Sequence, residues 1–560
     1  MKQTFYERIG ESVYREVLPN GLQVCVVPKP EHAKKYAFFA TRYGGMDTRF
    51  CLDGKWLDTP AGIAHYLEHK MFDTKEGNAL QELAKNGAEP NAFTSNAMTG
   101  YYFDSTEHFE ENLEILLSFV SIPYFTEESV AKEQGIIGQE IRMIEDNPDW
   151  QLYTRMMQAL YQKSTARTSI AGTVESISHI TAETLYDCHK AFYTPSNMIL
   201  TVVGNVDPIH VADLARRILP REGGPVIPRD YGQEPPQVAE KETCMAMEVS
   251  APQFLTAYKC APAADGEDYL RAAVIGDMAC DILLGDSSPL YQRLYEEGLI
   301  NTSFGGAFEM MPGVAYLYAG GDSKDARRAA AEIQKEAERL AANGIDEDYY
   351  QRVRRASFGS NLRGLNSFEN IAVTLTEGYF HGYDPFRFPQ VFDSITKEDI
   401  EAFLRENITP ERAVLSETVT RAPVAEIIAV GTGVEGEASA PDAMPVIADG
   451  YITLPTGEVL TYSDTATIRA TAYTHTDAGC DMTTYTGTTV HKGTVAVDPR
   501  YIPYGTRMFI VSNDGAYVYG ISVAEDCGGD IKGDRMDLYF PTFDECIQFG
   551  RRVCTIYFLD

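Results

Sequence analysis

The sequence predicts an α+β protein in which two similar halves are followed by a small all-β domain. Three observations lead to this prediction. The segment 180–203 aligns without gaps onto the segment 395–418, which indicates an internal duplication. A stretch rich in Gly, Ala, Pro and Glu follows the second copy, and beyond it short segments alternate polar and apolar residues. A chain of 560 residues is also too long for one hydrophobic core.

Both copies of the repeat predict the same order of elements. Thr181 and Thr396 are the expected N-caps of two equivalent helices. Leu185 and Ile400 fall on the buried faces of these helices. In each copy a Thr-Pro pair then ends the helix and a strand follows.

The repeat and the composition together divide the chain. We expect an N-terminal half over residues 1–220 and a second half over residues 221–423. Residues 424–449 are small and acidic with almost no large apolar side chain, which is typical of a linker. The alternating segments within residues 450–560 predict a compact all-β domain.

Composition and charge exclude several functions. With 44% hydrophobic and 23% charged residues the chain is close to an average globular protein. Its formal charge of -33 would repel nucleic acid and anionic lipid, so neither is an expected partner. We expect no membrane span, because no uncharged apolar stretch is long enough. The first residues lack an apolar signal sequence, which predicts a cytoplasmic chain.

The segment DTPAGIAHYLEHKMF predicts a helix with two histidines on one face. Thr59 and Pro60 are the expected N-cap and first-turn residues. His65, Glu68 and His69 are spaced i, i+3 and i+4 and therefore share a face. Zinc accepts imidazole nitrogen and carboxylate oxygen, so the face suits this metal. The alternative is that an isolated HxxEH string decorates an ordinary solvated helix.

A second predicted helix, capped by Thr126, offers further acids. Glu133 and Glu140 are seven residues apart and lie two turns along one face. One of them can bind a metal ion and the other can support it. Once zinc is placed, Glu68 beside His69 can take a proton from water and pass it to a leaving amine.

The motif HYLEH with its flanks GIAHYLEHKMF, followed by NAFTSNAMTGYYF and EQGIIGQE, closely resembles the pitrilysin/insulysin family of inverted-motif metallopeptidases over about residues 1 to 420. This resemblance implies one zinc ion held by His65, His69 and Glu140. It also implies that Glu68 is the catalytic base and that Glu133 supports the site. The family fold is a pair of insulinase-like α/β sandwich halves, of which the second is an inactive repeat, and the expected substrate is an extended or unfolded peptide.

The stretch Asn91–Phe103 is expected to be a strand beside this site. An extended peptide could add to such a strand by backbone pairing. The resemblance then makes four residues substrate-binding, namely Asn91, Ala92, Phe93 and Thr94. The alternative is an ordinary core strand.

One departure from the family pattern concerns the second half. Active members carry a run like L-R-E-x-G-L-x-Y whose Arg and Tyr reach the substrate at the zinc site. Here the run is LYEEGLIN, with Tyr295 in place of the Arg and Asn301 in place of the Tyr. We therefore expect a heterodimer in which a zinc-less relative supplies both side chains, by analogy with two-subunit family members.

The tail contains GTVAVDPRYIPYGT and VAEDCGGDIKGDRMDLYF, which resemble the three-aspartate (3D) domain, a double-psi β-barrel of bacterial cell-wall proteins and of the lytic transglycosylase A type. Asp498, Asp526 and Asp537 occupy the three aspartate positions. The resemblance implies that Asp537 is the acid/base of glycan cleavage, tuned by Asp526, and that peptidoglycan is a possible partner. The alternative is that these acids only shape turns.

Two further hypotheses stay open. The peptidase-like part of the chain could be a catalytically silent scaffold that pairs with an active relative, although such a chain has no need for Glu68. The tail could carry the useful chemistry as a peptidoglycan-cleaving or peptidoglycan-binding module. Four cysteines crowd this tail, at a density that suits disulfides in an oxidising compartment and hints at the cell wall. They are Cys480, Cys527, Cys546 and Cys554.

Overall fold

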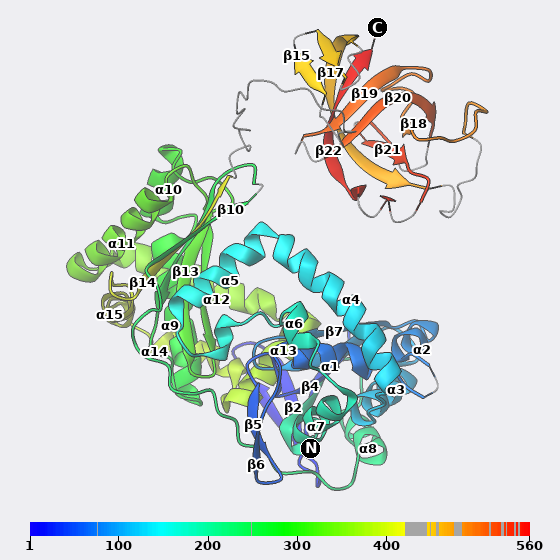
Figure 1. Ribbon diagram of the computed structural model, residues 1–560. Helices are drawn as coiled ribbons and strands as arrows, with labels where there is room; N and C mark the ends of the chain where they lie inside the picture. The colour runs from blue at the N-terminus through cyan, green and yellow to red at the C-terminus, as the bar shows by residue number, and fades with distance from the viewer. Residues whose placement is uncertain are drawn as a thin grey trace. The chain divides into compact units, whose positions relative to one another are not determined.

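The computed structural model describes residues 1–420, apart from 76 and 248, and residues 445–559, apart from 449, 455–458, 475–483, 514–516, 528–530, 534, 543–544 and 547–548. The chain forms two units, Met1–Glu426 and Ile427–Asp560 (Figure 1). Most of the expected linker at 424–449 lies outside the described residues.

The first half of the first unit is built on a seven-stranded sheet in the order β1-β2-β3-β9-β4-β8-β7. These strands are β1 (Lys2–Tyr6), β2 (Glu11–Val17), β3 (Gln23–Pro28), β4 (Lys35–Thr41), β7 (Glu89–Thr94), β8 (Thr99–Ser105) and β9 (Met198–Gly204). A separate hairpin joins β5 (Arg49–Leu52) and β6 (Lys55–Asp58). The helices are α1 (Ile63–Met71), α2 (Ala79–Lys85), α3 (Phe109–Ser121), α4 (Glu127–Asp146), α5 (Pro148–Leu160), α6 (Val174–Ile177), α7 (Ala182–Phe192) and α8 (Pro208–Ile218).

The second half has a five-stranded sheet in the order β10-β14-β11-β13-β12. Its strands are β10 (Glu242–Met247), β11 (Gln253–Lys259), β12 (Gly305–Met311), β13 (Val314–Asp322) and β14 (Ala413–Thr420). Its helices are α9 (Glu267–Leu284), α10 (Pro289–Glu296), α11 (Ala326–Asn343), α12 (Glu347–Gly364), α13 (Phe368–His381), α14 (Phe388–Ser394) and α15 (Lys397–Asn407).

The strand pairings confirm the predicted duplication. In the first half β9 runs parallel to β3 and antiparallel to β4. In the second half β14 runs parallel to β10 and antiparallel to β11. The helices before these strands, α7 and α15, both begin with a capping box, on Thr181 and Thr396 as the sequence predicts. Leu185 and Ile400 are both fully buried.

Each half contributes one helix that packs on the sheet of the other half. On one face the first sheet packs against its own helices, but its other face is covered by α13 of the second half, through Ile371 and Leu375 against Phe38 and Val203. Conversely, α5 of the first half lies on β11 and β14 of the second sheet. Each half therefore completes the hydrophobic core of the other.

Helix α1 begins later than the sequence predicts. The expected cap at Thr59 and Pro60 is wrong, because the helix starts at Ile63 and its N-cap is Gly62. The hydroxyl of Thr59 donates instead to the carbonyl of Thr48 at 3.1 Å. Gly62 has φ +91, and a Cβ there would lie 2.5 Å from the carbonyl oxygen of Ala171. Both the left-handed backbone and the close approach require glycine.

The second unit is a closed six-stranded β-barrel, which confirms the expected small all-β domain. Its strands follow the order β17-β21-β18-β20-β19-β22, and β22 pairs back onto β17. They are β17 (Val459–Tyr473), β18 (Thr494–Val497), β19 (Arg507–Ser512), β20 (Val518–Asp526), β21 (Arg535–Tyr539) and β22 (Arg552–Leu559). Two short strands, β15 (Val446–Ala448) and β16 (Tyr451–Thr453), continue the sheet at the first residues of β17, because β16 pairs with β17 and β15 pairs with β16. The end of the expected linker is thus part of this sheet.

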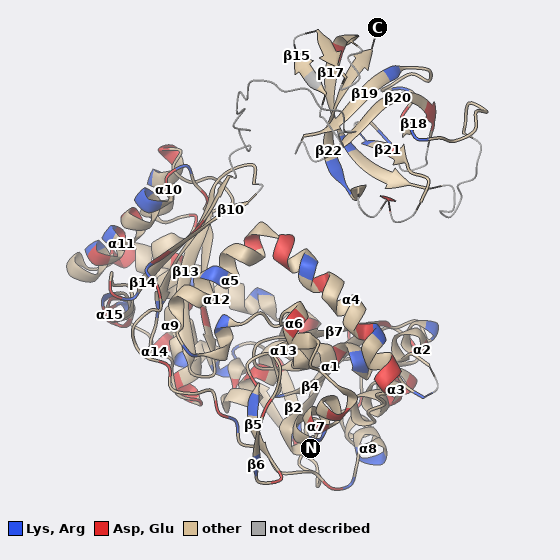
Figure 2. Cartoon of the chain, in the orientation of Figure 1, with Lys and Arg blue, Asp and Glu red and all other residues tan. Residues whose placement is uncertain are grey.

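Many charged residues lie along helix faces. In Figure 2 the ribbon marks Asp and Glu positions, interspersed with Lys and Arg positions, along helices such as α4 and α11. Charged faces of this kind stay hydrated and contribute little to stability. In the described part of the chain, no helix has both the length and the apolar character needed to cross a bilayer.

The start of α1 gives the first testable prediction. Gly62→Ala should lower the free energy of unfolding of the first unit by about 2 kcal/mol or more, because the left-handed backbone alone costs about 1–2 kcal/mol and the contact with Ala171 adds to it. Urea unfolding followed by tryptophan fluorescence reports on this unit, since both tryptophans, Trp56 and Trp150, lie in it. Gly87→Ala is the matched control, because Gly87 has φ +74 and open space around its Cβ position. Equal losses at the two positions would contradict the role of the Ala171 contact.

Candidate metal centre

Two helices converge at the site. Helix α4 begins with a capping box on Thr126, as the sequence predicts, and α1 packs against it (Figure 1). The buried hydroxyl of Tyr66 on α1 donates to the carbonyl of Val130 on α4. This contact fixes α1 beside the first turns of α4, so that the acids farther along α4 face the histidines.

The structure brings His65, His69 and Glu140 together. Nε2 of His65 lies 3.5 Å from Oε1 of Glu140, and Nε2 of His69 lies 3.5 Å from Oε2 of the same carboxylate. One ligand atom from each of the three residues lies within 4.8 Å of the others. Tetrahedral zinc with bonds of about 2.0–2.1 Å separates its ligand atoms by about 3.4 Å. The donor set and its spacing therefore fit a zinc ion.

Glu133 supports His69 from the other side of the ring. Its Oε1 lies 3.1 Å from Nδ1 of His69. This hydrogen bond leaves Nε2 of His69 directed at Glu140, which is the usual arrangement for a metal-binding histidine.

Neighbouring groups shift the pKa values of His69, Glu133 and Glu140. Hydrogen bonding from His69 holds the pKa of Glu133 below its ordinary value, against the opposing effect of burial. Hydrogen bonding from His65 lowers the pKa of Glu140 in the same way. Burial disfavours the charged form of His69, but Glu133 and the neighbouring carboxylates Glu68 and Glu140 raise its pKa overall. Both α4 carboxylates are thus kept ionised, as metal ligation or support requires.

Glu68 lies on α1, between the two histidines, with only 8% of its surface exposed. Its Oε2 accepts a hydrogen bond from the hydroxyl of Thr94 at 2.7 Å. The side chain of Thr94 thus contacts Glu68, and its expected role in binding substrate stays a prediction. The spacing of the sequence could not indicate this contact, because the two residues lie on different elements.

The expected single strand Asn91–Phe103 is wrong. It is a hairpin in which β7 pairs antiparallel with β8, and residues 95–98 form the turn. Asn91, Ala92, Phe93 and Thr94 all lie on β7, at the edge of the first sheet. Among the described strands β7 pairs with β8 alone, so its outer edge can accept an added strand.

A mostly apolar cavity of about 200 Å³ opens beside the ligands. His65 and Glu140 form part of its wall. The rest of the wall includes the large side chains Ile144, Trp150, Tyr153, Met157 and Ile170. The sequence analysis did not single out these residues, although Trp150, Tyr153 and Met157 form a visible cluster of large side chains in the segment NPDWQLYTRMM, a short distance after Glu140.

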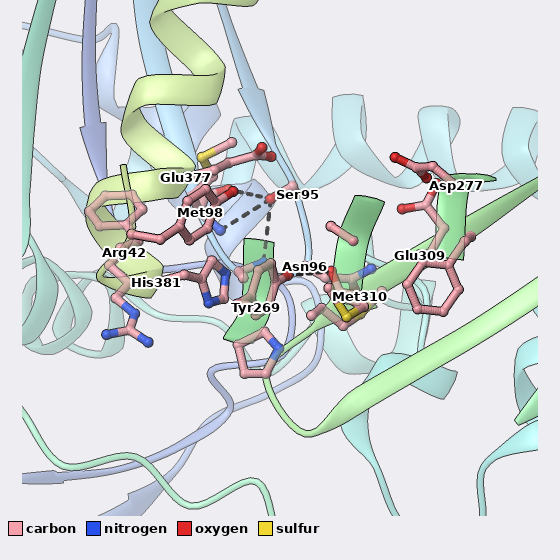
Figure 3. Close-up of a pocket in the computed structure, with 17 residues that line it drawn as sticks. Arg42, Ser95, Asn96, Met98, Tyr269, Asp277, Glu309, Met310, Glu377 and His381 are labelled. Atoms are coloured by element: carbon pink, nitrogen blue, oxygen red, sulfur yellow. Dashed lines mark hydrogen bonds between the residues drawn. The ribbon is translucent and has the colours of Figure 1, made fainter. Parts of the chain in front are cut away.

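A second cavity of about 320 Å³ lies between the two halves (Figure 3). Asn96 of the β7–β8 turn borders both this cavity and the apolar one. The second half contributes three acids to its wall, Asp277, Glu309 and Glu377. The hairpin turn thus stands between an apolar and an acidic hollow.

The positions that replace the family's Arg and Tyr have other contacts. Tyr295 lies in the last turn of α10 and stacks on Tyr291 with ring centroids 6.0 Å apart. Asn301 donates to the carboxylate of Asp322 at 2.9 Å. Neither lines the cavity that contains His65 and Glu140.

In the second unit, two of the three expected aspartates share a strand register. Ala496 of β18 pairs with Asp526 on β20 and with Asp537 on β21, which brings these two residues to one face of the barrel wall. Asp526 accepts hydrogen bonds from the hydroxyl of Tyr473 at 2.9 Å and from the backbone N–H of Tyr485 at 3.0 Å.

The third aspartate, Asp498, is hydrogen-bonded to Arg500 and Gly533. Its carboxylate accepts two hydrogen bonds from the Arg500 side chain, at 2.9 and 2.8 Å, and one from the backbone N–H of Gly533 at 3.0 Å. The Arg500 guanidinium, together with the backbone N–H groups of Gly533 and Arg500, holds the pKa of Asp498 well below its ordinary value. The expected part of Asp498 in a 3D-domain site stays a prediction. Cys480 lies outside the described residues, so the disulfide expectation for the four tail cysteines stays a prediction.

Three family models match the chain. The model described as Insulinase (Peptidase family M16) matches residues 54–174, and the one described as Peptidase M16 inactive domain matches residues 179–357. The model described as 3D domain matches residues 493–560.

Relatives and solved structures agree with these matches. The chain is 39% identical over 427 residues to the uncharacterized zinc protease YmfH of Bacillus subtilis, covering 75% of this chain and 100% of that protein. A putative M16-like peptidase from Alicyclobacillus acidocaldarius is 32% identical, with a TM-score of 0.71 over 73% of this chain and 98% of its own. A protease from Helicobacter pylori, 21% identical with a TM-score of 0.63 over 72% of this chain and 99% of its own, shares the fold. The protein therefore belongs to the insulinase family, peptidase family M16, and carries a C-terminal 3D domain.

Proposed function

We propose that the chain is a zinc-dependent endopeptidase that cleaves extended peptides or unfolded polypeptides. The observation that carries this proposal is the convergence of His65, His69 and Glu140 beside the buried carboxylate of Glu68. Relatives named zinc proteases support a hydrolase of this kind.

Each residue of the site has a separate role in the proposed hydrolysis. His65, His69 and Glu140 would hold zinc, which when bound polarises a carbonyl group and lowers the pKa of water. Glu68 takes the proton of the attacking water and delivers it to the leaving amine. The hydrogen bond from Thr94 keeps the Glu68 carboxylate in one orientation. Glu133 maintains the ring orientation of His69.

The surroundings of the site favour an extended substrate. A peptide added to the outer edge of β7 would run past Thr94 and Glu68 with its backbone paired. A bulky apolar side chain next to the scissile bond would fit the cavity walled by Trp150, Tyr153 and Met157. Unfolded polypeptides expose both the free backbone and such side chains.

The role of Glu68 gives a direct test. Glu68→Gln should lower kcat for a fluorogenic peptide by about 10²-fold or more, because the amide cannot accept the proton, while zinc content stays at one per chain. A chelator should abolish the wild-type activity, and added zinc should restore it. Glu128→Gln at the exposed start of α4 is the control and should behave as wild type. Full activity of Glu68→Gln would refute its assignment as base.

We also propose that the active peptidase is a heterodimer. In this chain Tyr295 and Asn301 stand where the family pattern has Arg and Tyr, and both are held by contacts within the second half. The charge that develops on the substrate carbonyl oxygen therefore lacks its second-half partners in the described chain. A zinc-less family member would supply them.

The heterodimer predicts complementation. The purified chain should hydrolyse peptides slowly, and adding a purified zinc-less relative from the same organism should raise kcat by about 10²-fold, which is typical of one added donor to a developing oxyanion. A partner whose Arg and Tyr are replaced by Ala and Phe is the control and should give no gain. If mixing never increases the rate, the heterodimer is excluded.

A second candidate function belongs to the C-terminal unit. We propose that Asp526 and Asp537 act on glycan strands such as peptidoglycan, because their common register with Ala496 places them on one face of the barrel wall, on either side of β18. One such group can protonate a glycosidic oxygen while the other tunes it.

This second activity is separable from the first. The full chain incubated with purified peptidoglycan should release anhydro-sugar products, Asp537→Asn should lose this release by about 10²-fold or more, and peptide hydrolysis should be unaffected. Asp464→Asn, at an exposed site on β17, is the matched control. Product release by Asp537→Asn at the wild-type rate would exclude Asp537 as the acid.

A further inference from the structure

Lys70 is a buried cation directly after the second histidine of the motif. Its side chain lies on α1 and is only 1% exposed. Lysine is almost never buried to this degree unless its charge is paired, because desolvating an ammonium group costs several kcal/mol. The position therefore needs a reason beyond packing.

The ammonium group contacts two acids and one carbonyl. Nζ of Lys70 donates to the carboxylate of Asp73, just beyond the C-terminal end of α1, and to the carbonyl of Ser129 at 3.3 Å. Oε2 of Glu133 lies 4.0 Å from the same nitrogen. The other oxygen of Glu133, Oε1, is the one that bonds to Nδ1 of His69. Glu133 thus stands between Lys70 and a proposed zinc ligand.

We propose that Lys70 is a positioning residue of the metal centre: it holds Glu133 where that carboxylate can bond to Nδ1 of His69, and so keeps Nε2 of His69 directed at the zinc ion. This inference rests on the proposed zinc function. Asp73 and Glu133 both lie close to Nζ, so without the ammonium group two carboxylates would face each other unshielded. Glu133 would then turn toward water, and His69 would lose its acceptor.

Lys70 is distinct from the other cation near Glu133. Lys132 precedes Glu133 on α4, but its side chain is exposed, so solvent and salt screen its charge. The buried ammonium group of Lys70 acts at short range and is desolvated, which makes its contribution larger. The two lysines therefore form a matched pair for an experiment.

The test is the zinc affinity of the full chain, measured by competition with a chromophoric chelator. Lys70→Met keeps the alkyl chain and removes the charge, and it should weaken zinc binding about 10-fold or more, as is typical for groups that support a metal ligand. Lys132→Met should change the affinity less than about 3-fold. The absorption bands of the cobalt-substituted protein should shift in Lys70→Met only, because the His69 ligand is reoriented.

A double-mutant cycle separates positioning from a general structural role. If Lys70 acts through Glu133, then Lys70→Met should have no further effect in a Glu133→Gln background. Equal losses in both backgrounds, or unchanged affinity in the single variant, would overturn the proposal. Should Lys70→Met fail to fold, Lys70→Gln offers an uncharged donor to Asp73 and must show the same loss. A wild-type chain that binds no zinc overturns the proposed function as well, whereas normal zinc binding by Lys70→Met overturns only the role of Lys70.

Discussion

The candidate metal centre depends on the contact between α1 and the first turns of α4. Helix α1 has only nine residues, which is too short for a helix to be stable without tertiary packing. Burial of its apolar face fixes its tilt, and the hydrogen bonds from Tyr66 and Lys70 to α4 carbonyls fix its register. With that register, the acids at 133 and 140 reach the two imidazoles. A slip of one residue along either helix would point these side chains apart.

The second half has a structural part in the same geometry. Helix α4 ends at Asp146, and α5 begins at Pro148 and packs onto the sheet of the second half. Glu140 is therefore held between a first turn anchored in the first half and a following helix anchored in the second. The apolar cavity beside Glu140 is walled by the same α5 residues. This explains why a half without metal ligands belongs to the site.

Local patterns in the sequence predicted the repeated and periodic parts well. The cap residues Thr181 and Thr396 marked two helices correctly, because an N-cap depends on its neighbours within one turn. The spacing of His65 and His69, and of Glu133 and Glu140, likewise predicted which side chains share a face. The prediction of Thr59 as the N-cap of α1 was wrong, because the N-cap is Gly62, three residues later, in a left-handed conformation against Ala171.

Long-range contacts could not be predicted in this way. The exchange of α5 and α13 leaves no mark in the sequence, since an amphipathic helix does not indicate which sheet it will cover. The hydrogen bond from Thr94 to Glu68 and the burial of Lys70 also depend on elements that are distant along the chain.

X-ray absorption at the zinc edge of the purified full chain shows whether two imidazoles and one carboxylate bind a single zinc ion. We expect two imidazole nitrogens and carboxylate or water oxygen at about 2.0–2.2 Å, with no sulfur ligand. A sulfur shell at about 2.3 Å from cysteine, or a spectrum without imidazole scattering, would contradict it.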